Sequence, residues 1–388
     1  MPAPSAEAVE MIRRLVAFDT TSRDSNLALI DWVRDYLAGH GIASEIVPDE
    51  TGRKANLFAT IGPADRPGIV LSGHTDVVPV DGQEWSSDPF ALVERDGRLH
   101  GRGTCDMKSF VAVALALVPE IKARVRATPV HFAFSYDEEV GCIGVRRLLD
   151  RLARREPKPW ACIVGEPTEM KPVRAHKGKV SQRARVRGFE AHSSIAPAGV
   201  NAIEYAGELI SFLLQRQRRF VAEGPLDEQF DIPYTTFSVG VIQGGIALNV
   251  VPKDCIFQFE FRHLPQVDPD VLYREIQDYA KRTLEPRMHA VKRGTGFAFE
   301  EMSSFPALDT SPDAEVTRLV KSLTRQNQHG KVAFGTEASV IAERGRIPSI
   351  VCGPGHIDQA HKPDEFTTIE QFRLCEDFMR RLADHVQG

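Results

Sequence analysis

Side chains that can bind metal ions follow four apolar runs of the sequence, each at the point where the run ends. They are His74 and Asp76 after the run at 69–71, Glu138 and Glu139 after the run that ends at Phe134, Glu166 after the run that ends at Val164, and His361 in the loop after the run at 349–352. A fifth candidate is Asp106, in the glycine-rich segment GRGTCDMK. Two imidazoles and several carboxylates can share one site only if cations balance the charge. This mixture of nitrogen and oxygen ligands suits zinc, cobalt or manganese better than calcium. With one carboxylate as a bridge, two metal ions about 3.5–4 Å apart can be held.

The surrounding pattern predicts that these residues lie at one edge of a sheet. Short apolar runs alternate with amphipathic stretches, which are predicted as helices at 109–125, 144–155 and 369–386. Such alternation is typical of a mostly parallel sheet with helices on both faces, whose ligands bind beyond the carboxyl ends of the strands. Alone, a His-x-Asp motif after a strand is more often structural, and a Glu-Glu pair usually lies in a solvated loop. The prediction of a metal site therefore depends on their joint occurrence.

The middle of the chain has a different pattern. Residues 179–188 and 255–265 alternate strictly between apolar and polar side chains. This period of two predicts strands of a sheet that is covered on one side only. Amphipathic stretches at 200–217 and 269–284 are predicted to be the helices that cover it. We therefore expect an α+β domain at 179–297, inserted into a larger α/β domain formed by 1–178 and 298–388.

Composition and charge exclude several other classes of protein. The 388 residues are 42% hydrophobic and 26% charged, with a net charge of −5, which is ordinary for a globular protein and gives no sign of nucleic-acid binding. The longest apolar run, 111–118, is too short for a membrane span, which needs about 20 residues. The six cysteines contain no CxxC pair and are expected to be reduced, and the N-terminus lacks the features of a signal peptide. A cytoplasmic protein is therefore expected.

Five segments of the chain resemble, in order, the signatures of the M20 metallopeptidase family: SGHTDVVP, GRGTCDMK, DEEVG, GEPT and GPGHIDQAHKPDE. The likeness extends from about residue 70 to residue 366. The resemblance implies an α/β catalytic domain like that of zinc peptidases, with a mostly parallel sheet between layers of helices. It also implies that the smaller inserted α+β domain serves as a lid and in dimerisation.

The resemblance implies a role for each candidate ligand. His74 and Glu166 would bind one divalent ion, Glu139 and His361 would bind a second, and Asp106 would bridge the two. The two ions would be Zn²⁺, with Co²⁺ as the alternative.

Two further residues of the same segments are implied to act without holding a metal ion. Asp76 would orient the imidazole of His74. Glu138 would be the general base, which takes a proton from water and carries it to the leaving amine.

More narrowly, the segments GEPTEMKPVRAHKGKVS, AHSS…GVNAIE, GTEA and IDQAHKPDEF resemble the acetylornithine deacetylases of this family. The resemblance implies a small-molecule substrate, N2-acetyl-L-ornithine, which would be converted to L-ornithine and acetate in arginine biosynthesis. It also implies a homodimer formed through the inserted domain, in which His192 reaches the partner's active site. Without the resemblance, His192 would be interpreted as a surface residue of a polar loop.

Residues that bind the substrate are expected outside the metal site. The resemblance implies that Arg262 binds the α-carboxylate of the substrate and that Asn249, Gly335 and Thr336 line the same pocket. A separate hypothesis is that Glu337 meets the distal ammonium group of ornithine.

The chain departs from the family pattern at two positions. Glu260 stands where an aspartate is usual, and Cys105 stands where a small residue such as alanine is common. The first departure leaves the exact fit of the substrate open. Separately, Lys177 and Lys179 in AHKGKVS could bind a second carboxylate on the acyl group. A succinyl-diaminopimelate desuccinylase or a broader N-acyl-amino-acid hydrolase is therefore an alternative. A non-catalytic metal-binding scaffold protein is an alternative of another class, which the presence of Glu138 and of all five ligand positions disfavours.

Overall fold

The computed structural model describes residues 3–387 and divides into two compact units. The first unit is formed by the described residues up to Ala175, by Leu308–Lys331 and by the described residues from Thr336 onward, and the second by His176–Ala307 and Val332–Gly335. The range 179–297 expected for the inserted domain lies inside the second unit, which extends further on both sides. The range expected for the catalytic domain includes residues 1, 2 and 388, which lie outside the described residues.

The first unit is built on a nine-stranded sheet in the order β1-β2-β6-β3-β7-β15-β8-β13, with β14 paired to β8. The strands are β1 Ser44–Pro48, β2 Ala55–Ile61, β3 Ile69–His74, β6 Val130–Ser135, β7 Ala161–Pro167, β8 Val173–His176, β13 Leu308–Asp309, β14 Gly330–Val332 and β15 Ser349–Gly353. The four central strands β6, β3, β7 and β15 are parallel to one another, and β2 and β8 flank them in the antiparallel direction. Every residue of the four central strands is buried, as expected for strands covered on both faces. The predicted mostly parallel sheet is confirmed.

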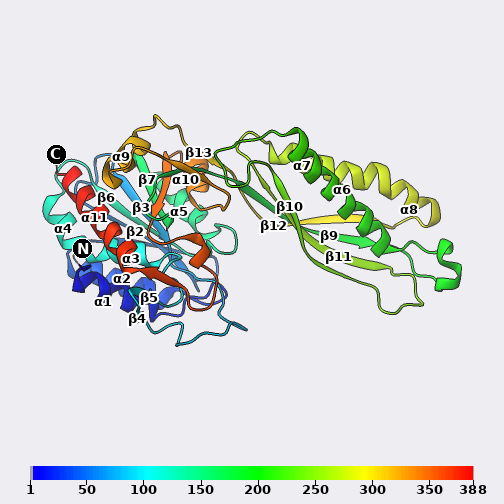
Figure 1. Ribbon diagram of the computed structural model, residues 1–388, viewed down its shortest axis with the longest axis horizontal. Coiled ribbons are helices and arrows are strands. Elements are labelled where there is room, and N and C mark those ends of the chain that lie inside the picture. Colours follow the sequence, from blue (N-terminus) through cyan, green and yellow to red (C-terminus); the bar gives the residue numbers. More distant parts are fainter. Residues whose placement is uncertain (1–2, 388) are drawn as a thin grey trace. The chain divides into compact units, whose positions relative to one another are not determined.

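Helices cover both faces of this sheet (Figure 1). They are α1 Ala6–Val16, α2 Leu27–Gly39, α3 Lys108–Ala116, α4 Val118–Arg124, α5 Gly144–Leu152, α9 Glu315–Thr324, α10 Ala338–Arg344 and α11 Ile369–His385. Neighbouring residues of a strand point to opposite faces. In β3, Gly73 faces α3, whereas the hydroxyl of Ser72 bonds Glu337 at the start of α10. The single helix predicted at 109–125 is two helices, because Pro119 lacks the N–H group that would continue α3 and instead stands in the first turn of α4.

Two glycines allow α3 to lie close to the central strands. A Cβ atom added at Gly165 in β7 would lie 1.9 Å from Phe110 Cγ, and one at Gly73 in β3 would lie 2.7 Å from Met107 Cε. A larger residue at either position would push the helix away from the sheet. The close packing matters for the site because the loop that carries Asp106 leads directly into α3.

A small second sheet joins two distant segments of the first unit. Its strands are β4 Val93–Arg95, β5 Arg98–His100 and β16 Phe366–Thr368, in the order β16-β5-β4. Phe366 pairs with His100, so that the residues just before β16 lie beside the residues just after β5. The loop to Asp106 begins after β5, and the segment that carries His361 ends at β16.

The second unit is a four-stranded antiparallel sheet in the order β10-β11-β9-β12, and α6, α7 and α8 lie along one of its faces (Figure 1). Its elements are β9 Gly178–Arg187, α6 Ala202–Glu223, β10 Thr236–Gly244, β11 Asp254–His263, α7 Pro269–Asp278, a π-helical turn Tyr279–Leu284, α8 Glu285–Val291 and β12 Gly296–Phe305. Alternate residues of β11, including Phe257, Phe259 and Phe261, are buried beneath the helices. The predicted sheet covered on one side is confirmed.

None of the helices in the described part of the chain is long and apolar enough to cross a membrane. All six cysteines are buried and free, as the sequence led us to expect. A cytoplasmic location stays a prediction.

His131 in β6 gives the first unit a pH-dependent stability. Its side chain is 6% exposed and stacks on Phe58, and its Nδ1 lies 2.9 Å from Thr60 Oγ1. Burial, together with the charge of Arg155, lowers its pKa from 6.5 to about 4. The unfolded chain therefore takes up a proton at a higher pH than the folded chain, so stability falls as the pH falls below about 6.5.

We predict that wild-type protein loses about 2 kcal/mol more stability between pH 7 and pH 5 than the variant His131→Gln, which keeps a polar partner for Thr60. Urea unfolding at the two pH values measures the difference. Equal losses in both proteins would contradict the assignment of this pH dependence to His131.

Candidate metal centre

The metal-binding candidates meet at the carboxyl ends of the four parallel strands. His74 ends β3, Glu166 stands next to last in β7, Glu138 and Glu139 follow β6, His361 lies in the segment after β15, and Asp106 precedes α3. The pairing register of the strands fixes how far along the sheet each residue lies, because His74 pairs with Ser135 and Ser72 pairs with Val164. His74 and Glu166 each stand two residues beyond the Ser72–Val164 pair, so they reach the same edge of the sheet.

Asp106 lies between two imidazoles. Its Oδ1 is 2.9 Å from His74 Nε2, and its Oδ2 is 3.1 Å from His361 Nε2. Each histidine also has a second carboxylate close by: Glu166 Oε1 is 3.5 Å from His74 Nε2, and Glu139 Oε2 is 3.0 Å from His361 Nε2. The arrangement is two imidazole–carboxylate pairs that share the one carboxylate of Asp106.

These charges shift one another's pKa values. Burial first, and then the charge of Asp106, raises the pKa of Glu139 to about 7 and that of Glu166 to about 8. Burial and the charge of Glu166 raise the pKa of Glu138 well above its usual value. Hydrogen bonds with Asp106 and Glu139 raise the pKa of His361 to about 11. The negative charge of the carboxylates thus exceeds what their surroundings compensate, and a divalent cation would compensate it and displace protons on binding.

The donor atoms fit divalent cations. Two groups of three residues each have three potential ligand atoms within 4.8 Å of one another. The first group is His74, Glu138 and Glu166, and the second is His74, Asp106 and Glu139. Glu139 Oε1 is buried and has no hydrogen-bond partner among the described residues. A buried carboxylate oxygen without a partner is costly, and coordination to a metal ion removes that cost. Imidazole nitrogen together with carboxylate oxygen suits zinc, cobalt or manganese.

Comparison with known proteins agrees with this chemistry. The model of peptidase family M20/M25/M40 matches residues 70–385. The chain belongs to this family. It is therefore a metal-dependent hydrolase. Similar sequences include the acetylornithine deacetylase of Myxococcus xanthus, 36% identical over 100% of this chain and 98% of that protein. The acetylornithine deacetylase of Pasteurella multocida is 34% identical over 96% of each chain.

Several solved structures of peptidases share the fold, and those from Sulfolobus solfataricus and Bacillus subtilis belong to the M20 family. A metallo-carboxypeptidase from Sulfolobus solfataricus matches with a TM-score of 0.77 at 14% identity, over 99% of this chain and 100% of that chain. A tripeptidase from Staphylococcus aureus matches with a TM-score of 0.76 at 20% identity, over 99% of both chains. A dinuclear metal-binding M20 peptidase from Bacillus subtilis matches with a TM-score of 0.68 at 18% identity, over 98% of this chain and 97% of that chain.

Asp76 contacts the site in a different way from the one expected. The Nδ1 of His74 lies 2.8 Å from the backbone carbonyl oxygen of Asp76, whereas the nearest carboxylate oxygen is 3.7 Å away. The carboxylate instead accepts hydrogen bonds from the backbone N–H groups of Glu138 and Glu139, at 3.1 and 3.3 Å, and from the hydroxyl of Ser22 at 2.7 Å. Asp76 therefore orients His74 through its backbone and fixes the Glu138–Glu139 turn through its side chain.

Glu337 does not have the surroundings of a substrate-binding residue. It is fully buried, and its two oxygens accept hydrogen bonds from Ser72 Oγ at 2.7 Å and Ser135 Oγ at 2.6 Å. Both oxygens are thus used to join β3 to β6 beneath the metal centre. This placement contradicts the hypothesis that Glu337 meets a substrate ammonium group.

Gly335, Thr336 and Cys105 each have a structural role in the fold. A Cβ atom at Gly335 would lie 2.0 Å from Phe305 Cε2, so only glycine fits there. Thr336 is fully buried and its Oγ1 accepts the backbone N–H of Ala338 at the start of α10. The Sγ of Cys105 lies 3.3 Å from the backbone oxygen of His356, and burial raises the pKa of its thiol well above the usual value.

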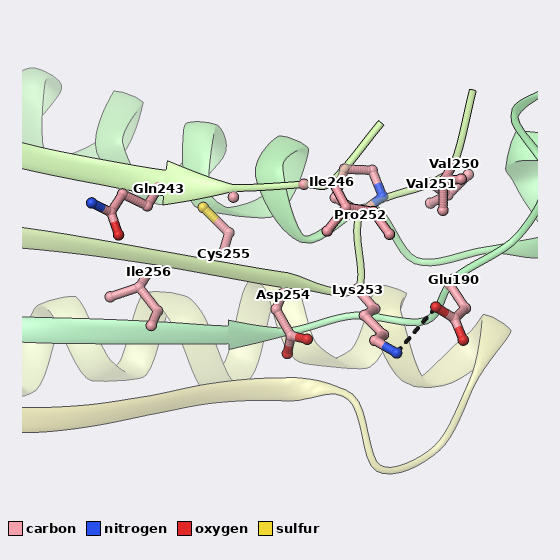
Figure 2. A pocket seen from close by; sticks show the side chains of 12 residues that line it. Glu190, Gln243, Ile246, Val250, Val251, Pro252, Lys253, Asp254, Cys255 and Ile256 are labelled. Atoms are coloured by element: carbon pink, nitrogen blue, oxygen red, sulfur yellow. Dashed lines mark ion pairs between the residues drawn. The ribbon is translucent and has the colours of Figure 1, made fainter. Parts of the chain in front are cut away.

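His192 and Asn249 lie together at one end of the second unit. His192 pairs with Val250 in an isolated β-bridge, and the backbone N–H of Ser193 donates to the backbone oxygen of Asn249 at 3.0 Å. The side chain of His192 is exposed, with its Nδ1 2.8 Å from Ser194 Oγ. A pocket of about 230 Å³ lies beside this loop, lined by Glu190, Gln243–Ile246 and Val250–Ile256, with an ion pair between Glu190 and Lys253 on its rim (Figure 2).

Arg262 lies on the face of the second unit's sheet that the helices leave uncovered. It is partly exposed and pairs with Glu260, whose Oε1 is 3.0 Å from its Nε. Burial and the charge of Arg262 lower the pKa of Lys177 to about 8, and Lys177 Nζ donates to the backbone oxygen of Tyr234 at 2.6 Å. Two cations thus lie near each other, an arrangement that favours binding of an anion.

Two residues near the metal centre were not singled out from the sequence. Arg102 and Glu365 are both 1% exposed, and Glu365 contacts the backbone of the loop that carries Asp106. Both stand inside the matched motifs GRGTCDMK and GPGHIDQAHKPDE. Their place inside the motifs was visible in the sequence. Their burial, which shows that they matter, cannot be predicted from such polar segments.

We predict that Asp76→Asn lowers turnover about 10–100-fold, because an amide cannot accept all three hydrogen bonds that fix the Glu138–Glu139 turn. Turnover and bound metal are measured on the same purified sample. Unchanged turnover at wild-type metal content would contradict the assigned role of the Asp76 carboxylate.

Proposed function

We propose that this chain removes the acetyl group from N2-acetyl-L-ornithine and releases L-ornithine and acetate. The observation that carries the substrate is the full-length likeness to relatives named acetylornithine deacetylase, at 34% and 36% identity. The name of each relative states that it removes the acetyl group from acetylornithine, which is an N-acetyl amino acid. A role in arginine biosynthesis follows from the same proposal.

We assign two divalent cations to the site, with zinc as the first choice and cobalt as the second. His74 and Glu166 would hold one ion, Glu139 and His361 would hold the other, and Asp106 would contribute one oxygen to each. The position of Asp106 between two imidazoles, at 2.9 and 3.1 Å, supports this assignment. The M20 peptidase from Bacillus subtilis with the same fold is described as dinuclear.

Glu138 is the proposed general base and acid. When bound, a pair of divalent cations polarises a carbonyl oxygen and lowers the pKa of water to about 7. An oxygen of Glu138 lies among the potential ligand atoms of His74 and Glu166, and its Oε1 accepts a hydrogen bond from Cys142 Sγ at 3.3 Å. From this position Glu138 would take a proton from the attacking water and later give it to the leaving amine.

Arg262 is the proposed partner of the substrate α-carboxylate, with Asn249 as a further polar contact. A guanidinium group binds a carboxylate through two parallel hydrogen bonds, and Arg262 is partly exposed on its strand. A second substrate carboxylate, as in a succinyl substrate, would have to bind Lys177 or Lys179. Lys177 already donates to Tyr234, and Lys179 Nζ lies 5.3 Å from the centre of the Phe305 ring.

We also propose that the active enzyme is a homodimer formed through the second unit. Support comes from the exposed apolar side chains Ile246 and Leu248, whose exposed fractions are 86% and 102%, close in sequence to Asn249. His192 lies at the same end and is itself exposed. In the dimer His192 would donate to the oxyanion that forms in the active site of the partner.

The substrate assignment is tested by measuring amine release from N2-acetyl-L-ornithine, N-succinyl-diaminopimelate and N-acetylmethionine by zinc-loaded protein. We expect a strong preference for acetylornithine that a chelator abolishes. Zinc-loaded Glu138→Gln should turn over about 10²–10⁴-fold more slowly with its zinc content unchanged, while the exposed-site control Glu50→Gln keeps wild-type rates. Faster turnover of another acyl donor would contradict the ornithine assignment and leave the metal-dependent chemistry standing.

The dimer proposal predicts that two inactive variants complement each other. His192→Ala and Glu138→Gln should each be nearly inactive alone. Mixed under conditions that exchange subunits, they should recover activity, because one active site of the mixed dimer has an intact Glu138 and receives an intact His192. Absence of recovery, with subunit exchange demonstrated by differently tagged chains, would contradict the crossing of His192 between subunits.

A further inference from the structure

A buried ion pair lies behind the metal centre. Arg102 and Glu365 are each 1% exposed, and Arg102 Nη1 is 2.6 Å from Glu365 Oε2. The two residues come from segments 263 positions apart in the chain. Removing two charges from water costs several kcal/mol per ion unless further hydrogen bonds satisfy them. The further hydrogen-bond partners of Arg102 and Glu365 therefore show what this buried pair holds in place.

Glu365 holds the backbone of Asp106. Its Oε1 accepts the N–H groups of Cys105 and Asp106, at 2.9 and 3.0 Å. Its own backbone oxygen accepts the N–H of Gly101 at 2.9 Å, so the carboxylate is itself held against the loop. The side chain of Asp106 must divide its two oxygens between His74 and His361, and a shift of its backbone would disturb both contacts.

Arg102 extends the same connection to His361. Its Nη2 donates to Gln83 Oε1 at 2.5 Å, and Gln83 Nε2 donates to the backbone oxygen of His361 at 3.0 Å. His361 has a φ of 62°, in the left-handed region that costs a residue other than glycine about 1–2 kcal/mol. The bond from Gln83 helps to hold the histidine in this conformation.

We propose that Glu365, Arg102 and Gln83 form a positioning chain that sets the spacing between Asp106 and His361. The chain thereby tunes the affinity of the cation that Asp106, Glu139 and His361 would hold. None of the three residues would touch the substrate or the metal ion, so they are positioning residues. The inference rests on the two-metal site proposed above.

A merely structural role for Glu365 makes a different prediction. It would lower the stability of the fold without a selective effect on one metal ion. Glu376 provides the matched control, because it is also 1% exposed and carries the same kinds of contact. Its Oε1 accepts from Arg380 Nη2 at 2.7 Å, and its Oε2 accepts the backbone N–H of Ser5 at 3.0 Å, both outside the metal centre.

The test is calorimetric titration of metal-free full-length protein with Co²⁺, for wild type, Glu365→Gln and Glu376→Gln. We expect wild type to bind two ions. Glu365→Gln should bind the ion at His361 about 10–100-fold more weakly, the usual cost of losing outer partners of metal ligands, because both Asp106 and His361 lose support. The ion at His74, which shares only Asp106 with this chain, should be weakened less. Glu376→Gln should bind both ions like wild type, and the thermal stability of each variant is recorded in parallel.

Gln83→Ala keeps the test decisive if Glu365→Gln does not fold. Gln83 is only half-buried, so its removal should leave the fold intact and should weaken the same ion, because the His361 backbone loses its hydrogen bond. If the folded variants bind both ions with wild-type affinity, the inference about the positioning chain is wrong, but the two-metal proposal is not affected. A wild-type protein that binds fewer than two ions would contradict the two-metal proposal and the inference with it.

Discussion

The candidate metal centre depends on the position of the Asp106 carboxylate between two imidazoles. One oxygen lies 2.9 Å from His74 and the other 3.1 Å from His361, and these histidines come from opposite ends of the sequence. Such sharing requires the three segments to be held within about 0.5 Å of the productive geometry. The parallel strands β3, β6 and β7 bring His74, Glu138, Glu139 and Glu166 to one edge, and the glycines of β3 and β7 allow α3 to bring Asp106 to the same place.

A group of buried carboxylates supports the ligands without belonging to them. Asp76 fixes the Glu138–Glu139 turn, Glu337 joins β3 to β6 through two serines, and Glu365 holds the backbone of Asp106. Each has its charge balanced by hydrogen-bond donors, as buried charged groups require. Glu139 differs from these three, because its Oε1 has no donor within the described part of the chain. This contrast separates the carboxylates that support the site from one that is available to a cation.

That the candidate ligands lie close together could be predicted from the sequence, because all of them except Asp106 follow a strand whose apolar character is local. The supporting contacts could not, because they join residues far apart in the chain. Ser72 and Glu337 are 265 positions apart, and Arg102 and Glu365 are 263 apart. The burial of Glu337, which contradicts a contact with the substrate ammonium group, follows from how α10 packs on the sheet. The Asp76 carboxylate fixes the Glu138–Glu139 turn by accepting backbone N–H groups, and a pattern of side chains in the sequence does not predict such contacts.

Anomalous diffraction from crystals of the zinc-loaded protein, recorded at the zinc absorption edge, tests the central claim most directly. The account predicts two peaks about 3.5–4 Å apart, one on each side of the Asp106 carboxylate, with His74 and Glu166 at the first and Glu139 and His361 at the second. A single peak, or two peaks without Asp106 between them, would contradict the shared carboxylate and the mechanism that follows from it.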